Sequence, residues 1–307
     1  MNRTELKKII GGVSMAVPTA FDSQYKLDLA ATTDLTQFWV ENGLGTDKSM
    51  IKLCSAWGQG PDISDEEWPH LVRTVVNAGG SGVNVMCGLK SKDTMRTIED
   101  AKIAQDMGAN SLQIELPYNH APNQDQYVKH FTMISDAIDI GIMIYNTYWF
   151  GVSPIEPETM ARLKDAEHVA AIKWHYPTDE GYDKMKEFSD EFNVIDNAGQ
   201  HVRCRKNGGE GIVSAFGPAY PKHDLKVWDL IENGKYEEAE ALEKSFNETI
   251  GPALLKISSN SGGYRAARGM MELVGHPVGP PRLPTEPLTS EELSVLKVAM
   301  KNCGWLD

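Results

Sequence analysis

A single lysine lies inside an apolar run that is predicted to form a buried strand. The stretch AAIKWHYP, residues 170–177, reads as a strand that includes Lys173, and Pro177 ends it. A buried ammonium group costs free energy unless it is paired or loses its proton. Burial lowers a lysine pKa toward roughly 7–8, where the neutral amine can attack a carbonyl carbon and form a Schiff base. Lys173 is therefore either such a nucleophile or a strand-end lysine whose ammonium group reaches solvent.

Schiff-base chemistry also needs a group that transfers protons, and two side chains suit that task. Tyr145 ends the preceding predicted strand, and its hydroxyl could relay protons. His175 follows Lys173 by two residues, so both side chains face the same side of an ideal strand. A histidine there could act as a general acid or base near neutral pH. The alternatives are a core tyrosine with a satisfied hydroxyl and a hydrogen-bonded structural histidine.

Eight short apolar runs, separated by stretches of helical periodicity, must position these side chains. The runs are GVSMAVPTAF (12–21), MIKLCSA (50–56), GVNVMCG (82–88), SLQIELP (111–117), GIMIYNT (141–147), VAAIKWH (169–175), FNVIDNA (192–198) and GIVSAFG (211–217). Apolar strands that alternate with helices indicate a parallel sheet covered on its faces. Eight such units match the (β/α)8 TIM barrel. The competing doubly wound sheet usually carries a Gly-rich phosphate loop after its first strand, and none occurs here.

The predicted barrel occupies residues 1–230, and residues 231–307 are predicted as a C-terminal helical extension packed on it. The extension contains the helical stretches 235–257 and 289–300 and the Pro-rich link HPVGPPRLPTEP, and no composition shift marks an independent fold. In such a barrel the functional groups lie where the strands end and the following loops begin. The polar residues that end the apolar runs are therefore candidate site residues.

Composition and charge argue against several kinds of partner. The formal net charge of −13 disfavours nucleic acid and anionic membranes. The four cysteines are widely separated, and no histidine lies at metal-ligand spacing from them, which predicts free thiols and no metal. No apolar run approaches ~18 residues, and the N-terminal segment lacks the apolar core of a signal peptide, so we expect a cytoplasmic protein.

The sequence resembles the dihydrodipicolinate synthase / N-acetylneuraminate lyase family of class I aldolases along almost its whole length, as a divergent member. The matching stretches, in order, are AVPTAFD, GPDISDEEW, LPYNHAPNQDQYVKHF, IYN, AIK, GGEGIVS and GPPRLP. The resemblance implies a (β/α)8 barrel, with Lys173 as the Schiff-base lysine and Tyr145 as the proton-relay tyrosine. It also implies a homotetramer or homodimer, with no cofactor beyond the covalent lysine adduct.

The sequence departs from the family pattern where the substrate carboxylate is held. The family commonly has Gly-Thr-Thr-Gly-Glu after strand two, whereas residues 55–59 here are SAWGQ. Both central hydroxyls are missing, but Ser55 lies one step earlier, and the backbone N–H groups of Ala56 and Trp57 could still bind an anion. The arginine that dihydrodipicolinate synthases carry after strand five is also absent, and Asn119 replaces one of two tyrosines after strand four. These differences argue against a dihydrodipicolinate synthase proper.

Aromatic residues occur near the strand ends in place of these groups. They are Trp57, Tyr148, Trp149, Phe150 and Trp174. Aromatic side chains at a barrel mouth could form a flat wall that stacks on a ring, as in the hydratase-aldolases that split arylidene-pyruvates. The alternative is ordinary packing between helices and barrel.

Several further residues are candidates for substrate binding. The full set of predicted substrate-binding residues is Ser55, Ala56, Trp57, Tyr118, Asn119, Trp149, Asn197 and Val213. Gln200 and His201, after strand seven, and His120, after strand four, are weaker candidates.

We therefore expect a metal-independent Schiff-base lyase or aldolase that acts on a pyruvate-type 2-oxo acid with an aromatic or apolar distal group. The first alternative is a Schiff-base dehydratase of a 2-keto-3-deoxy sugar acid, because the same imine supports both reactions. The second is a barrel that binds a carbonyl ligand without turnover, which the altered strand-two loop favours. The expected partner is a small carbonyl compound.

Overall fold

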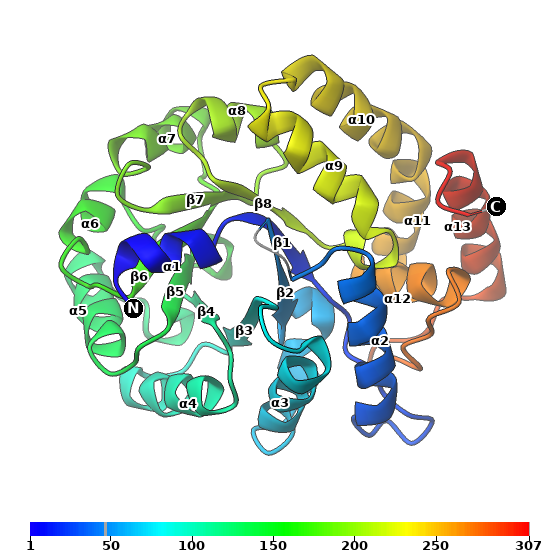
Figure 1. Ribbon diagram of the computed structural model, residues 1–307, viewed down its shortest axis with the longest axis horizontal. Coiled ribbons are helices and arrows are strands. Elements are labelled where there is room, and N and C mark those ends of the chain that lie inside the picture. Colours follow the sequence, from blue (N-terminus) through cyan, green and yellow to red (C-terminus); the bar gives the residue numbers. More distant parts are fainter. Residues whose placement is uncertain (46–47, 307) are drawn as a thin grey trace.

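The protein forms a closed barrel of eight parallel strands, as the sequence predicts (Figure 1). The computed structural model describes residues 1–45 and 48–306. Each strand pairs with the next, and β8 pairs with β1. The strands are β1 (Gly12–Ala16), β2 (Ser49–Leu53), β3 (Val85–Leu89), β4 (Ser111–Glu115), β5 (Gly141–Tyr145), β6 (Val169–Trp174), β7 (Asn193–Asp196) and β8 (Gly211–Ser214).

The strand residues are buried almost without exception, which explains their near-continuous apolar sequences. Side chains alternate between the barrel interior and the surrounding helices, and both environments exclude water. Among the described strand residues, the three that are only partly buried are Glu115, Tyr145 and Val213. Because Glu115 and Tyr145 are the last residues of their strands, the barrel opens to solvent at the C-terminal ends of the strands.

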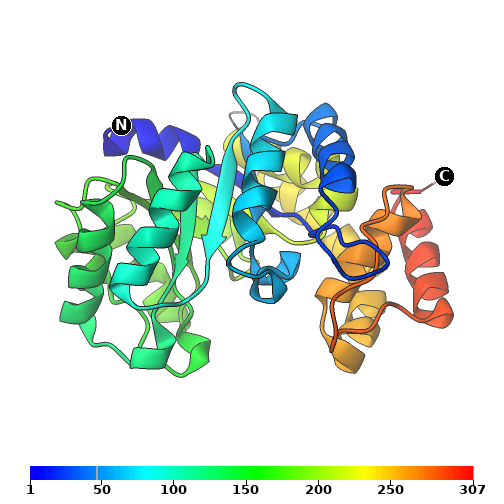
Figure 2. The ribbon, with the colours of Figure 1, turned by 90° about the horizontal axis from the view of Figure 1, so that it is seen from below.

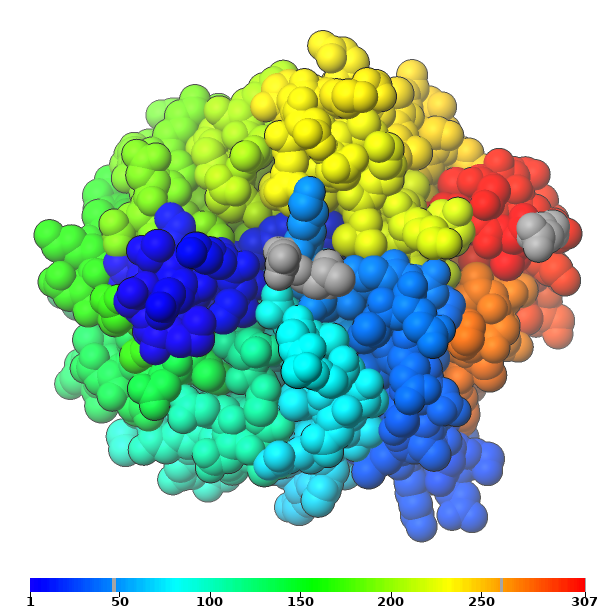
Figure 3. Space-filling view, in the orientation of Figure 1, coloured from blue at the N-terminus to red at the C-terminus, as the bar shows by residue number. Residues whose placement is uncertain are grey.

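Helices surround the barrel and close its opposite end. They are α1 (Arg3–Ile9), α2 (Leu29–Glu41), α3 (Trp68–Gly79), α4 (Thr94–Asp106), α5 (Gln124–Ser135), α6 (Pro157–Arg162), α7 (Asp179–Asp183), α8 (His201–Lys206), α9 (Pro221–Glu232), α10 (Tyr236–Thr249), α11 (Gly251–Ser261), α12 (Tyr264–Leu273) and α13 (Ser290–Asn302). Leu6 of α1 and the adjacent Ile10 pack among the interior methionines, and the dark blue N-terminal segment lies across this face in Figure 3. The N-terminal end of the barrel is therefore plugged.

The C-terminal helices α11, α12 and α13 lie together on one side of the barrel (Figure 2). Arg268 of α12 joins them to the first βα loop by donating through Nη1 to the carbonyl of Thr19, and its Nη2 atom donates to carbonyls of the Pro-rich link. Arg282 of that link makes an ion pair with Glu67, ahead of α3. The extension thereby supports the loops after β1 and β2. In the described part of the chain, no helix has both the length and the apolar character needed to span a bilayer.

Candidate active site

The strand register determines which side chains share a level inside the barrel. Around the closed sheet, inward-facing residues at one level come from alternate strands. The next member of a level is found by following the register partners across two strands and then moving two residues toward the C-terminal end of the second strand. One level, here called the lysine layer, contains Lys52, Gln113, Lys173 and Val213. The same count places Tyr145 and Asn197 one level closer to the open end, and Glu115 and His175 at the rim.

Lys173, predicted as the nucleophile, is buried directly below Tyr145. Its Nζ atom lies 3.6 Å from the centroid of the tyrosine ring. Burial lowers its pKa well below the usual value, and the positive charge of Lys52 lowers it further, whereas the carboxylate of Glu115 acts in the opposite direction. The ring face favours the ammonium form as well, but burial dominates. These surroundings favour the neutral amine form of Lys173.

The Tyr145 hydroxyl is placed to donate a proton next to this amine. Burial raises the pKa of its hydroxyl, the charge of Glu115 raises it further, and a hydrogen bond with the Asn197 side chain opposes both. The hydroxyl therefore remains protonated at neutral pH and can donate. Asn197, which the sequence predicts as a substrate ligand, lies at the same level as Tyr145 and orients its hydroxyl.

The turn after β2 is held in shape by local contacts. Its 3₁₀ helix η1 (Ala56–Gly58) begins after Ser55, whose hydroxyl accepts a hydrogen bond from the N–H of Gly58 at 3.3 Å. Thr19 donates to the Gly58 carbonyl at 2.6 Å, and a Cβ at this glycine would lie 2.5 Å from a backbone oxygen of the β1 loop. The N–H groups of Ala56 and Trp57 have no acceptor within this turn, because they occupy its first two positions.

Aromatic rings line one side of the mouth, over the turns that follow β4 and β5. These turns are the 3₁₀ helices η3 (Tyr118–His120) and η4 (Tyr148–Phe150). Successive ring centroids lie 4.7–5.8 Å apart, from Tyr118 to Phe150 and from Tyr145 through Trp149 to His175. Trp149 is 41% exposed and Phe150 is 50% exposed. The rings that we call the aromatic wall are Tyr118, Tyr145, Tyr148, Trp149, Phe150 and His175.

His175 is part of this wall through a polar contact as well. Its Nδ1 atom lies 3.2 Å from the Tyr148 hydroxyl. The side chain is partly exposed at the rim, on the same face of β6 as Lys173.

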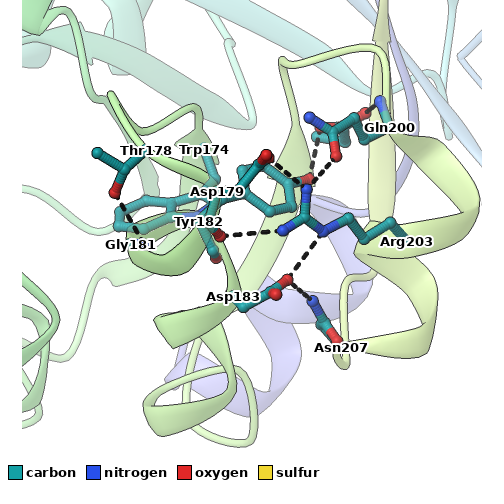
Figure 4. A network of polar contacts seen from close by, with 10 residues as sticks. Trp174, Thr178, Asp179, Gly181, Tyr182, Asp183, Gln200, Arg203 and Asn207 are labelled. Carbon is teal, nitrogen blue, oxygen red and sulfur yellow. Dashed lines mark hydrogen bonds and ion pairs between the residues drawn. The ribbon is translucent and has the colours of Figure 1, made fainter.

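Two tryptophans that were candidates for the wall lie elsewhere. Trp174 is fully buried behind β6, where it packs against Phe188 and donates to the Tyr182 carbonyl at 3.0 Å (Figure 4). Its prediction as a mouth residue is wrong, because neighbouring residues of a strand point to opposite faces and Lys173 takes the inner one. Trp57 packs against Phe216 and the start of α12, on the opposite side of the mouth from the aromatic wall.

The weaker candidates after β7 are engaged in structural contacts. Gln200 accepts a hydrogen bond from Arg203 at 2.6 Å, and Arg203 also binds Asp179 and Asp183 (Figure 4). This network connects α7 to α8 behind β6 and β7. After β4, Asn119 and His120 are exposed on η3.

His201 forms an ion-pair chain between the barrel and α10. Its Nδ1 atom lies 2.6 Å from Asp196, and its Nε2 atom lies 3.1 Å from Glu243. Burial alone would lower its pKa, but the hydrogen bond to Asp196 and the charge of Glu243 raise it above the usual value. The imidazolium form therefore stabilises the fold.

We expect His201→Gln to destabilise the protein by about 3 kcal/mol at pH 6, because the buried carboxylate of Asp196 and the partly buried carboxylate of Glu243 lose their cation. The folded-state pKa is raised, so this contribution is complete below the unfolded pKa and declines as the pH rises through the folded pKa. Urea unfolding at pH 6 and pH 9, with Lys244→Gln as the control on α10, measures the difference. An equal loss at both pH values would contradict the ion-pair explanation.

A cavity of about 310 Å³ adjoins the mouth at the ends of β7 and β8. Asn197 and Val213, both predicted substrate-binding residues, line it together with Ser214, Asp224 and Glu243. Its lining is thus more polar than the aromatic wall. Within residues 1–45 and 48–306, no group of three or more His, Cys, Asp or Glu side chains is arranged to hold a metal ion.

Three residues of the site were missed by sequence reasoning. Asn146 follows Tyr145 and is buried, donating to the His175 carbonyl at 3.0 Å and accepting from the Ile155 N–H at 2.9 Å, so it holds the ends of β5 and β6 together. Lys52 shows the signal that identified Lys173, a single lysine in the apolar run MIKLCSA. Glu115 lies inside the run SLQIELP and is the last residue of β4, and period-2 alternation places it on the inner face.

Comparisons with known proteins agree with this architecture. Residues 9–303 match the model of the Dihydrodipicolinate synthetase family. The chain is 27% identical over 303 residues to the 4-hydroxy-tetrahydrodipicolinate synthase of Corynebacterium jeikeium, and the alignment covers 96% of this chain and 95% of that protein. It is 28% identical over 296 residues to 4-hydroxy-tetrahydrodipicolinate synthase 1 of Halalkalibacterium halodurans, with 95% and 96% covered.

Solved structures share the fold over the whole chain. The dihydrodipicolinate synthase of Thermotoga maritima is similar with a TM-score of 0.85 and 25% identity, and 97% of this chain and 100% of that chain are covered. A dihydrodipicolinate synthase of Cyanidioschyzon merolae, solved with lysine bound, has a TM-score of 0.85 at 24% identity, covering 97% and 99%. At the latter identity the similarity concerns the fold alone.

Proposed function

Because the chain belongs to the Dihydrodipicolinate synthetase family, we propose that it is a lyase that forms a Schiff base between Lys173 and a pyruvate-type 2-oxo acid. The enzyme class follows from the family, because the relatives named above are 4-hydroxy-tetrahydrodipicolinate synthases, which are lyases of the aldolase type. The observation that carries the proposal is the buried Lys173 amine, 3.6 Å from the Tyr145 ring at the open end of the barrel.

The proposed reaction begins with attack of the neutral Lys173 amine on the ketone carbon. Tyr145 donates a proton to the carbonyl oxygen, and the resulting carbinolamine loses water to give a protonated imine. The imine withdraws electrons from the adjacent carbon. Loss of a proton from that carbon, or cleavage of its bond to the distal part of the substrate, then gives an enamine. His175 at the rim is the candidate acid or base for the distal group.

The substrate carboxylate is proposed to bind the backbone N–H groups of Ala56 and Trp57. These donors are free within η1, and Ser55 and Thr19 hold the turn in place. Backbone donors alone bind a carboxylate less tightly than a bidentate arginine does. A higher KM for the 2-oxo acid than in members with the arginine is therefore expected.

The aromatic wall supports an aryl or apolar distal group on the substrate. Trp149 and Phe150 expose ring surface beside Tyr145, where a planar group could stack. A second candidate is a dehydratase that acts on a 2-keto-3-deoxy sugar acid. It is favoured by the polar cavity next to Asn197 and Val213, which offers partners for substrate hydroxyls.

Borohydride trapping tests the proposed function. The protein is incubated with pyruvate, and separately with larger 2-oxo acids, aryl aldehydes and 2-keto-3-deoxy sugar acids, and then reduced. Peptide mass spectrometry locates the adduct. We expect a pyruvate adduct on Lys173, and aldol products from pyruvate with aryl aldehydes. Trapping confined to the sugar acids would favour the dehydratase. No adduct with any compound, together with thermal stabilisation by one of them, would favour a non-catalytic binding protein.

Tyr145→Phe should separate imine formation from proton transfer. We expect kcat to fall about 100-fold, because general acid–base catalysis is lost while the amine remains. The Lys173 adduct should still form, more slowly, and Tyr236→Phe on α10 should behave like the wild type. Unchanged kcat in Tyr145→Phe would assign the proton relay to another group.

Assembly as a homotetramer or homodimer is part of the proposal, since it rests on the family resemblance. A related dihydrodipicolinate synthase variant has been described as monomeric, so the state varies among similar proteins. Light scattering of the purified chain measures it directly.

A further inference from the structure

A second lysine, Lys52, occupies the lysine layer together with Lys173. It comes from β2, which lies on the opposite side of the barrel from β6. Its side chain is fully buried, and its position two residues after Met50 places it on the inner face of the strand. Both lysines therefore enter the same cross-section of the barrel from opposite walls.

Among the residues that the structure describes, the Lys52 ammonium has no hydrogen-bond partner that would give it a structural role. Its Nζ atom is buried without a hydrogen bond, and so are Ser14 Oγ one level below and Gln113 Oε1 in the same layer. The remaining side chains of the level below are apolar: Met86, Met143 and Ile195. A buried charge without a partner costs free energy. Lys52 thus weakens the fold at a place where an apolar residue would pack.

We propose that Lys52 is a positioning residue that carries the positive charge of the lysine layer, so that Lys173 opposite it stays a neutral amine. This inference rests on the proposed Schiff-base function of Lys173. A nearby cation disfavours protonation of a second amine, which is a known way to activate a nucleophilic lysine.

The charges around Lys52 and Lys173 are consistent with a charged Lys52 and a neutral Lys173. Burial lowers the pKa of Lys52 to about 7, so it is mainly protonated below that pH. Burial and the charge of Lys52 together lower the pKa of Lys173 further. The titratable groups that face the pair are Glu115 from β4, Tyr145 from β5 and His175 from β6. Strands β1, β3, β7 and β8 and the α1 plug contribute Ser14, Met86, Gly88, Ile195, Asn197, Val213, Leu6 and Ile10, which do not titrate.

Glu115 is the charge that opposes Lys52. Its carboxylate favours the ammonium form of Lys173, and burial raises the pKa of Glu115 itself. When Lys52 is removed, Glu115 remains as the charged group that acts on Lys173. Protonation of Lys173 then becomes more favourable, and the amine is blocked at mildly acidic pH.

The test measures the rate of pyruvate trapping on Lys173 against pH in the full-length wild type, in Lys52→Met and in Lys52→Gln. At pH 6 we expect both variants to trap about tenfold more slowly than the wild type, because Lys173 regains its proton. At pH 9 the three rates should agree, because Lys173 is then neutral in all of them. Lys48→Met is the control. Lys48 lies just before β2, is exposed, and forms an ion pair with Glu232 of α9.

A second measurement does not depend on substrate. Trace labelling with acetic anhydride, read by peptide mass spectrometry, follows the protonation of Lys173 directly. Its titration midpoint should move to higher pH in both Lys52 variants. This shift without any pyruvate adduct would refute the proposed function but support the coupling of the two amines. Identical labelling and trapping profiles in wild type and variants would overturn the inference, as would a wild-type adduct on Lys52.

Discussion

Lys173→Met is expected to lose the reducible adduct and to lower kcat at least about 10⁴-fold, the scale seen when an activated nucleophile is removed. Methionine has nearly the length and volume of lysine without its charge, so the interior of β6 keeps its packing. No neighbouring side chain can replace the amine, because Tyr145 and Asn197 at the next level are neutral and Lys52 lies across the barrel.

The variant should also be at least as stable as the wild type, since it removes a buried amine whose charged form is disfavoured. Unfolding by urea therefore separates lost chemistry from lost structure. Lys222→Met on α9 is the matched control, at a lysine outside the barrel. An adduct that persists in Lys173→Met, or turnover within tenfold of the wild type, would show that the proposed mechanism is wrong.

Lys52→Met is expected to stabilise the protein, most strongly at and below pH 7. The ordinary lysine pKa is 10.5, and burial lowers that of Lys52 to about 7 in the folded state. Between these values the unfolded chain binds more protons, so wild-type stability is highest above 10.5 and is lost as the pH falls toward 7. The upper limit of this loss is about 5 kcal/mol, because each pKa unit corresponds to about 1.4 kcal/mol.

Urea unfolding of wild type and Lys52→Met at pH 6, 8 and 10 measures the effect. We expect the variant to gain about 2–5 kcal/mol at pH 6, and the difference to shrink as the pH approaches 10. Lys48→Met should change stability by less than about 0.5 kcal/mol, as most surface substitutions do. A gain that is equal at all three pH values would mean that packing, and not the buried charge, separates the variant from the wild type.

The two buried lysines are expected to make the protein less stable and the Lys173 amine more reactive. We expect Lys52 and Lys173 both to lower the free energy of unfolding at neutral pH, because the same burial that is unfavourable for folding makes an amine nucleophilic. A variant that gains stability and loses reactivity below pH 7 is the combined signature of this arrangement.

Much of the fold and the reactive centre follows from local sequence. Eight apolar runs of strand length alternate with helices, and this pattern specifies the barrel because each strand must be covered on both faces. Lys173 and Tyr145 stand out because a charged or polar residue at the inner end of such a run has few structural uses. The outward direction of Trp174 also follows from alternation, although sequence reasoning placed it at the mouth.

Contacts between distant segments could not be read from the sequence. The polar pattern after β7 suggested substrate ligands, but Gln200 binds Arg203 and His201 joins Asp196 to Glu243 of α10. Which partner such a side chain takes depends on the packing of α7, α8 and α10 around it. Likewise, Trp57 is held by α12, a helix from the far end of the chain.

The placement of Lys52 and Lys173 at one level of the barrel is the clearest case of a feature decided by tertiary structure. By itself the sequence determined that each lysine lies in a buried strand, because local hydrophobicity is enough for that. Only closure of the barrel sets the register around all eight strands, and that register alone brings residues of β2 and β6 to one level. The strength of a charge interaction depends on distance in space, which a position along the chain does not specify.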